Sequence, residues 1–159
     1  MTIKVGDRIP DATLGCMTPQ GPSTLTTREI FDGRKVVLFA VPGAFTPTCS
    51  KQHLPSYLRQ HDAIKAAGID TIACLAVNDV FVLDAWARQN EVGDRILMLS
   101  DGNGEFVDAL GLALDATKYR MGIRAQRFAM IVEAGIVTQI NVEVPGEFKV
   151  SSAEYTCQL

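Results

Sequence analysis

The sequence predicts an α/β fold in which a central mixed sheet is flanked by helices on both faces. Three observations predict this class. Short apolar runs rich in Val, Ile and Leu alternate along the chain with segments of helical periodicity. The first two of these runs enclose one helical segment, which is the order of a right-handed βαβ unit with parallel strands. Two later runs meet at Ala134-Gly135, a pair typical of the turn of an antiparallel hairpin.

The individual elements follow from the same patterns and from residues suited to helix ends. Gly68 suits the end of the first long helix, and Ser151-Ser152-Ala153-Glu154 resembles the capping box of a last helix. The expected strands are a short one near 11–14 and five more at 35–41, 70–77, 96–99, 127–133 and 135–142. The expected helices are a turn after Thr26 or Thr27, segments at 49–67 and 104–110, one from Asn78 or Asp79 to about Gln89, and one after Ser152.

The order βαβ followed by ββα is that of a thioredoxin-like fold, here with an N-terminal extension. The length of 159 residues suits a single domain that covers residues 1–159. Hydrophobic residues make up 47% of the chain and charged residues 21%, which is a globular balance with enough apolar material for a core.

Charge and hydropathy exclude several classes of partner. The net charge is −3, with no broad excess of Lys or Arg, so nucleic acid and anionic membranes are not expected as main partners. Residues 1–10 lack the apolar core of a signal peptide, and the longest apolar run, 36–41, is too short to cross a bilayer. We therefore expect a cytoplasmic location by default.

The four cysteines, at positions 16, 49, 74 and 157, are scattered and form no CxxC pair. This spacing predicts neither a zinc ribbon nor a dithiol redox motif. The turn around Asp101 and Asn103 offers too few ligands for a calcium loop. We therefore expect neither a zinc nor a calcium site at these residues, and we expect four free thiols in a reducing cytosol.

Cys49 is the candidate nucleophile because of its place in the fold. It follows the segment Val41-Pro-Gly-Ala-Phe-Thr-Pro-Thr, which leads from a buried strand into a helix. The unpaired N–H groups of a first helical turn carry partial positive charge and stabilise a thiolate. Pro42 stiffens the loop, and Thr46 offers a hydroxyl one helical turn before the thiol. A buried packing cysteine remains the alternative interpretation.

A thiolate that breaks an O–O bond also needs a fixed cation, because negative charge builds up on the leaving oxygen. Arg127 opens the apolar strand RFAMIVE, where a cation has no packing role. A strand-end residue that reaches solvent is the alternative, and Arg124 is the weaker candidate. His53 lies one helical turn after Cys49, but a base there points away from the helix mouth, so polar packing is the better interpretation.

At this point the residues resemble a known family. VPGAFTPTCS at 41–50 resembles the active-site signature of peroxiredoxins of the atypical type II, peroxiredoxin-five-like, subfamily. Its pattern Pro-x-x-x-Thr-x-x-Cys is met by Pro42, Thr46 and Cys49. The resemblance extends over about residues 2–156. The later matching segments are His53-Leu54-Pro55, ACLAVND at 73–79 with Phe81 and Trp86, Arg127-Phe128 and GIVTQINVE.

The resemblance implies a thioredoxin-fold peroxidase acting on hydrogen peroxide and organic hydroperoxides. Cys49 would be the peroxidatic cysteine that becomes a sulfenic acid. Thr46 and Arg127 would orient the peroxide and stabilise charge, and Pro42 would shield the sulfenate. No metal or bound cofactor is implied. Family members of this type are often homodimers that meet near the active-site loops.

The route that resets Cys49 is open. Cys74 lies mid-strand, and a disulfide needs Cα atoms within about 7 Å, so it could meet Cys49 only if the helix start unwound. A subset of type II members carries a similarly placed cysteine. Animal-type members carry their resolving cysteine in the loop before the last helix. That loop has no cysteine here, so the family role does not transfer to Cys157, which lies near the end of the chain. We assign no role to Cys16. We favour a one-cysteine cycle completed by an external thiol: glutathione with or without glutaredoxin, or thioredoxin.

Two other functions fit a reactive thiol. A cysteine hydrolase or acyl transferase would need a His base with an orienting Asn or Asp, and neither His53 nor His61 has an obvious partner of that kind. A redox sensor would use the same thiol without turnover, but it does not need the full set of Pro, Thr, Cys and Arg. Turnover of peroxide, and not of activated esters, discriminates among these functions.

Overall fold

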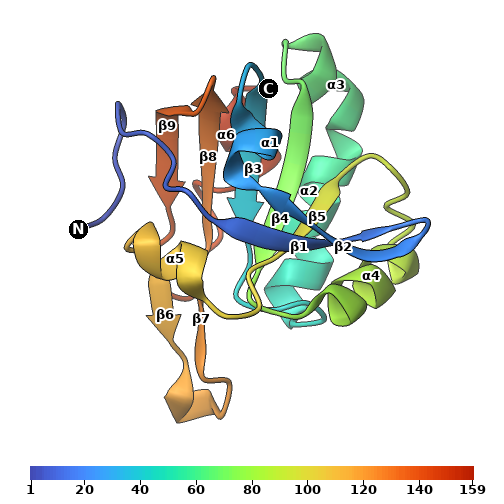
Figure 1. Ribbon diagram of the computed structural model, residues 1–159, viewed down its shortest axis with the longest axis vertical. Coiled ribbons are helices and arrows are strands. Elements are labelled where there is room, and N and C mark those ends of the chain that lie inside the picture. Colours follow the sequence, from blue (N-terminus) through green and yellow to red (C-terminus); the bar gives the residue numbers. More distant parts are fainter.

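The computed structural model describes residues 1–159 and has a seven-stranded mixed sheet at its centre (Figure 1). The sheet has the order β2-β1-β5-β4-β3-β8-β9 and consists of β1 (Thr13–Thr18), β2 (Gly21–Thr26), β3 (Lys35–Ala40), β4 (Thr71–Ala76), β5 (Leu97–Ser100), β8 (Phe128–Glu133) and β9 (Ile136–Val142). Strands β3, β4 and β5 are parallel, and the other pairs are antiparallel. The predicted fold class, a thioredoxin-like α/β fold with a central mixed sheet, is confirmed.

Helices cover both faces of this sheet. They are α1 (Thr27–Phe31), α2 (Leu54–Arg59), α3 (His61–Ala66), α4 (Val80–Gln89), α5 (Glu105–Ala109) and α6 (Ala153–Cys157). Side chains of α1 and α5 join the apolar cluster on one face, and those of α2, α3, α4 and α6 join the cluster on the other. The active-site candidates belong to the second face.

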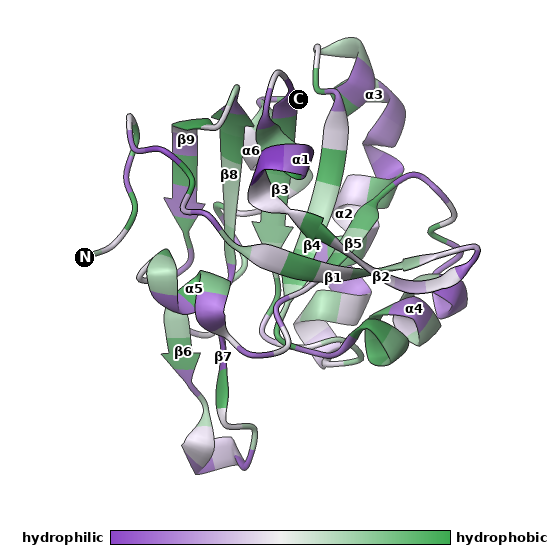
Figure 2. Cartoon of the chain, in the orientation of Figure 1, coloured by the Kyte–Doolittle hydropathy of each residue, from purple (hydrophilic) through white to green (hydrophobic).

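The central strands β3 and β4 contribute to both apolar clusters because successive side chains of a strand point to opposite faces. Leu38 lies in the cluster under α1 and α5, whereas its neighbours Val37 and Phe39 lie in the cluster under α2 and α4. All three are fully buried. Figure 2 shows these central strands mostly in the hydrophobic colours, while α1 is strongly hydrophilic. The continuous apolar runs in the sequence are the signature of this double burial.

The predicted helix over 49–67 is wrong as a single helix. A π-helical turn, Cys49–His53, comes first, and the chain then bends at Gln60 between α2 and α3. Pro55 has no N–H to donate, and the N–H of Leu54 reaches back to the carbonyl of Cys49. The π-helical turn therefore lies where Pro55 removes one backbone hydrogen bond of a regular α-helix.

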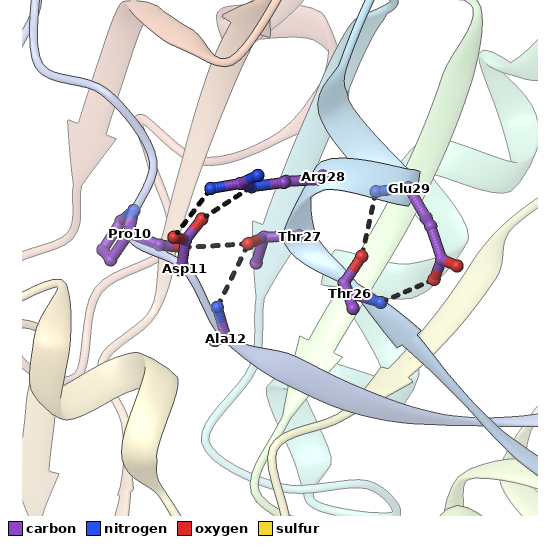
Figure 3. Close-up of polar contacts among 7 residues, drawn as sticks. All are labelled: Pro10, Asp11, Ala12, Thr26, Thr27, Arg28 and Glu29. Atoms are coloured by element: carbon purple, nitrogen blue, oxygen red, sulfur yellow. Dashed lines mark hydrogen bonds and ion pairs between the residues drawn. The ribbon is translucent and has the colours of Figure 1, made fainter.

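The N-terminal extension is larger than expected. The strand near 11–14 is β1, and it forms a hairpin with β2, which was not predicted because its sequence GPSTLT is polar and largely exposed. The helical turn begins where expected. Thr26 and Glu29 form a capping box at the start of α1, and Arg28 pairs with Asp11 at 3.3 Å between Nη2 and Oδ2 (Figure 3).

The first residues run along the outer edge of β9. The N–H of Gly6 donates to the carbonyl of Val137 at 2.8 Å, and the N–H of Val137 donates to Asp7 at 2.9 Å. Arg8 and Ile136 form an antiparallel bridge. The N-terminal segment thus pairs with an edge strand that would otherwise be open.

A second, two-stranded sheet was also not predicted. It pairs β6 (Ala113–Asp115) with β7 (Ile123–Ala125) around a 3₁₀ turn at Thr117–Tyr119, and it projects from the body at the bottom of Figure 1. Its strands have three residues each, which is too short for a periodic signal.

The remaining expected elements are close to the prediction. Ala134 and Gly135 have φ values of 49° and 81°, as the tight turn between β8 and β9 requires. Ser152 is the N-cap of helix α6, and its side chain accepts from the N–H of Tyr155. The predicted capping box is therefore wrong in detail, because Tyr155 and not Glu154 occupies the partner position. No helix is both long and apolar enough to span a membrane.

Candidate active site

The sulfur of Cys49 lies at the carboxyl end of β3, where the chain turns into the π-helical turn. Cys49 is fully buried and is the first residue of that turn. The guanidinium of Arg127 lies directly before β8, the strand that neighbours β3, and its Nη2 donates to the Cys49 Sγ at 3.0 Å. A fixed positive charge therefore lies against a buried sulfur.

The loop from Pro42 to Thr48 is held by polar contacts that the sequence did not reveal. The N–H of Ala44 donates to the side-chain oxygen of Asn78 at 2.9 Å, which ties the loop to the end of β4. Phe45 has a φ of 65°, an uncommon value for a residue with a side chain. Asn78 was considered only as a helix cap, but Asp79 is the cap of α4.

Thr46 does not contact the sulfur in this structure. Its hydroxyl donates to the carbonyl of Gly43 at 2.6 Å, which closes the loop on itself. With that proton engaged, the Thr46 oxygen is left as an acceptor. It can therefore receive a hydrogen bond from a ligand above Cys49 more readily than donate one.

His53 is the main contact that sequence reasoning missed. Its Nδ1 lies 2.9 Å from Nη1 of Arg127, and its Nε2 lies 3.0 Å from the carbonyl of Ser151. A carbonyl and a guanidinium each have only one role in a hydrogen bond, so Nε2 carries the proton and Nδ1 accepts. The spacing of one helical turn from Cys49 was the available signal, and it was interpreted as polar packing.

Burial, and then the charge of Arg127, lower the pKa of His53 to about 3. The imidazole is therefore neutral at physiological pH. Since both ring nitrogens are engaged, His53 is not placed to act as the base of a cysteine hydrolase. It instead orients the guanidinium, because it accepts one N–H of Arg127 and leaves another for the sulfur.

A pocket of about 520 Å³ opens beside Arg127, and neither Cys49 nor His53 lines it. Its lining includes Pro42, Thr48, Tyr119, Gln126 and Arg127, together with the segment 143–147. The volume suits a small ligand with an organic substituent. The lining comes from elements far apart in sequence, the loop after β3 and the small β6–β7 sheet among them.

The weaker cationic candidate, Arg124, does not contact the sulfur. Its Nε donates to the carbonyl of Met121 at 2.8 Å. A Cβ atom built on Gly43 would lie 3.4 Å from Nη1 of Arg124, so this side chain packs against the loop. The structure thus separates the two arginines, one on the sulfur and one on the loop.

The start of the π-helical turn has one further anchor. The indole N–H of Trp86, fully buried on α4, donates to the hydroxyl of Ser50 at 2.9 Å. This bond joins the residue after Cys49 to the helix that follows β4.

All four cysteines are free, and the other three differ from Cys49 in environment. Cys74 is fully buried on β4, and burial first and Cys49 second raise its pKa well above the usual value. Burial first and Glu154 second raise the pKa of Cys157 to about 11. Burial, followed by Glu29, raises the pKa of Cys16. None of these three thiols is bonded to a cation.

Comparison with known proteins agrees with this architecture. The model of the redoxin family matches residues 4–156. Peroxiredoxin-2E-2 of rice, described as chloroplastic, is 48% identical over 96% of this chain and 70% of its own length. Peroxiredoxin-2D of Arabidopsis thaliana is 44% identical over 96% of this chain and 94% of its own.

Solved structures of peroxiredoxins are similar to this chain over nearly its whole length. Reduced Prx3 of Vibrio vulnificus in complex with H₂O₂ superposes with a TM-score of 0.95 at 48% identity, covering 99% of this chain and 98% of that one. Peroxiredoxin 5 of Alvinella pompejana superposes with a TM-score of 0.82 at 36% identity, covering 98% and 94%. The chain therefore belongs to the redoxin family and is a peroxiredoxin of the type II, peroxiredoxin-five-like subfamily, an oxidoreductase with thiol-dependent peroxidase activity.

Proposed function

We propose that this chain reduces hydrogen peroxide and organic hydroperoxides through a sulfenic acid on Cys49, which an external thiol then recycles. The observation that carries the proposal is the bond of 3.0 Å from Nη2 of Arg127 to the buried Cys49 Sγ. The similar Prx3 of Vibrio vulnificus was solved in complex with H₂O₂, which supports hydrogen peroxide as one substrate.

In the proposed first step, the Cys49 thiolate attacks the terminal oxygen of the hydroperoxide. The S–O bond forms as the O–O bond breaks, so the sulfur is oxidised by two electrons and the peroxide is reduced. The leaving alkoxide or hydroxide takes a proton from water. Arg127 stabilises the negative charge that moves from sulfur to the leaving oxygen. Thr46 accepts the hydrogen bond of the peroxide O–H, and Pro42 shields the product.

We propose a one-cysteine cycle for the second half of the reaction. A reducing thiol condenses with the sulfenic acid, which releases water and leaves a mixed disulfide. A second thiol then releases Cys49. Full burial and a raised pKa disfavour Cys74 as the partner, and the raised pKa of Cys157 disfavours that thiol. Glutathione with or without glutaredoxin, or thioredoxin, would be the donor.

A homodimer and a cytoplasmic location complete the proposal. Exposed aromatic side chains of Phe45 and Tyr119 lie on the active-site loop and on the small sheet packed beside it, which favours a partner surface there. Four free thiols favour a reducing compartment. Two relatives are described as chloroplastic, so fractionation of a tagged chain is the test of location.

Substitution of Cys49 and mass spectrometry together test the chemistry. The variant Cys49→Ser should lose all peroxide reduction, whereas Cys16→Ser should retain it. After one equivalent of peroxide, the intact mass should rise by one oxygen at Cys49 under acid quench. Peroxide turnover by Cys49→Ser would refute the proposal, and a loss of two hydrogens with a peptide linking Cys49 to Cys74 or Cys157 would replace the one-cysteine cycle by a two-cysteine cycle.

A further inference from the structure

The carboxylate of Glu143 is buried close to the active site but does not touch the sulfur. Glu143 directly follows β9 and is 7% exposed. Its oxygens accept from the N–H of Lys149 at 2.8 Å, of Val150 at 3.0 Å and of Ser151 at 3.0 Å. They also accept from the hydroxyl of Ser151 at 2.6 Å. One carboxylate thus fixes the end of the segment that leads into α6.

These bonds belong to a closed ring that contains the active-site arginine. The carbonyl of Ser151 accepts from Nε2 of His53 at 3.0 Å, and Nδ1 of His53 lies 2.9 Å from Nη1 of Arg127. The carbonyl of Arg127 accepts from the N–H of Glu143 at 2.9 Å. Glu143 is therefore bonded to the main chain of Arg127 on one side and, through two residues, to its guanidinium on the other.

The interior location strengthens this ring. His53 and Ser151 are both fully buried, so water does not compete for their bonds. The burial of Glu143 raises its pKa, but hydrogen bonds from Ser151, Val150 and Lys149 outweigh that effect, and the net pKa is lowered. The carboxylate is ionised at neutral pH and acts only as an acceptor. Every N–H and O–H that faces it must therefore donate toward it.

We propose that Glu143 is a positioning residue for Arg127 and acts through Ser151 and His53. By holding Ser151, it keeps one carbonyl against Nε2 of His53, which fixes the tautomer of the ring. Nδ1 must then accept from Arg127, and the guanidinium is held with Nη2 on the sulfur. The proposal rests on the role given to Arg127 in the proposed function.

Glu143→Gln tests the proposal because it keeps the shape of the side chain but replaces one acceptor oxygen by a donor. We expect the second-order rate constant for peroxide to fall about 10-fold to 100-fold, as for a misplacement of the reacting groups by up to 1 Å. Glu133→Gln is the matched control, since Glu133 is exposed at the end of β8 and makes no side-chain hydrogen bond. It should react as the parent chain does.

Nitrogen-15 NMR of His53 gives a readout that a merely structural role would not move. The parent chain should show one neutral tautomer with the proton on Nε2. In Glu143→Gln the His53 signals should become those of a mixture of tautomers while the remaining spectrum stays folded. A slower Glu143→Gln variant that keeps the single Nε2–H tautomer would overturn the proposal, as would an unchanged rate.

A double-mutant cycle with His53→Gln tests whether Glu143 acts through His53. If it does, adding Glu143→Gln to His53→Gln should produce little further loss, whereas independent effects would multiply and contradict the proposal. If Glu143→Gln does not fold, Ser151→Ala is the second variant, because it removes only the hydroxyl that donates to Glu143. It should shift His53 toward a mixture of tautomers as well. An unchanged His53 tautomer in Ser151→Ala would also contradict the proposal.

Arg127→Ala distinguishes a failure of the inference about Glu143 from a failure of the proposed function. A large loss of rate in Arg127→Ala with no loss in Glu143→Gln would refute only the inference about Glu143. An unchanged rate in Arg127→Ala would refute the proposed function itself.

Discussion

Arg127 makes two side-chain contacts at the active site, one to the sulfur of Cys49 and one to the ring of His53. The positive charge beside the sulfur therefore has a neutral, buried hydrogen-bond acceptor on its other side. An arginine at the start of an apolar strand was a sound expectation, because no packing role explains it. The orienting role of His53 was not foreseen, because its spacing from Cys49 does not show that its ring meets the side chain of Arg127 from a distant part of the sequence.

Replacement of Arg127 by Ala should reduce peroxide reactivity by about 3 kcal/mol of transition-state stabilisation, or roughly 100-fold in rate. The reason is the loss of the charge next to the leaving oxygen. Stopped-flow measurement of the second-order rate constant checks this. Arg124→Ala should lose much less, because Arg124 packs on the loop; a larger loss in Arg124→Ala than in Arg127→Ala would reverse the assignment.

His53 makes the stability of the chain sensitive to acid. Its pKa is about 3 in the folded chain and about 6.5 when unfolded, so between these values the unfolded state binds more protons. The free energy of unfolding should therefore fall as the pH decreases from 6.5 toward 3, by on the order of a few kcal/mol from this residue. Urea unfolding across this range should show a flatter profile in His53→Gln, and equal slopes would contradict the assignment.

Among the elements, the pieces that sequence patterns identify best are those buried on both faces. Strands β3 and β4 were placed within one or two residues because their runs of Val, Ile and Leu have no other explanation. The edge strand β2 and the pair β6 and β7 were missed, since polar or three-residue strands carry no periodic pattern. The π-helical turn was missed because it depends on Pro55 and on packing against Trp86, and not on periodicity.

In the active site, too, local sequence patterns identify some parts and miss others. The loop from Pro42 to Cys49 could be predicted because its composition is unusual and its place between a strand and a helix is informative. Asn78 could not, because its bond to Ala44 joins two loops that only the parallel pairing of β3 and β4 brings together. Contacts between loops at one edge of a sheet are a property of the fold, and a local pattern does not encode them.

Asn78→Ala should loosen the active-site loop and slow peroxide reduction about 10-fold, because the loop loses its tie to β4. The neighbouring change Asp79→Ala is the control. It removes the cap of α4 and should lower the free energy of unfolding by about 1 kcal/mol with the peroxide rate retained. Rate constants and thermal unfolding of both variants check this: Asn78→Ala should mainly lose rate, and Asp79→Ala should mainly lose stability. A rate loss in Asp79→Ala alone would contradict the role of Asn78.

At the scale of the whole molecule, two exposed aromatic side chains lie on segments beside the active-site loop. Phe45 is 47% exposed although its backbone has an uncommon conformation, and Tyr119 is exposed on the projecting small sheet. Both belong to segments that border the pocket. A surface of this kind favours self-association beside the site, as proposed for the homodimer.

Phe45→Glu should shift the chain from dimer to monomer, because it places a charge in the centre of that surface. Analytical ultracentrifugation over a range of concentrations measures the change. Tyr155→Glu is the control, since Tyr155 is 55% exposed on α6, which lies at the other end of β3 from that loop (Figure 1). The proposed interface is wrong if Tyr155→Glu dissociates the dimer and Phe45→Glu does not.

The pairing of the first residues with β9 has a consequence for handling the protein. The two outermost strands differ in how they are protected: β2 is short and polar and contains Pro22, while β9 relies on its pairing with the N-terminal segment around Gly6. A preparation clipped by protease before residue 10 would leave β9 open to annealing with another molecule. Such material should precipitate on storage even though every atom of the catalytic centre is retained.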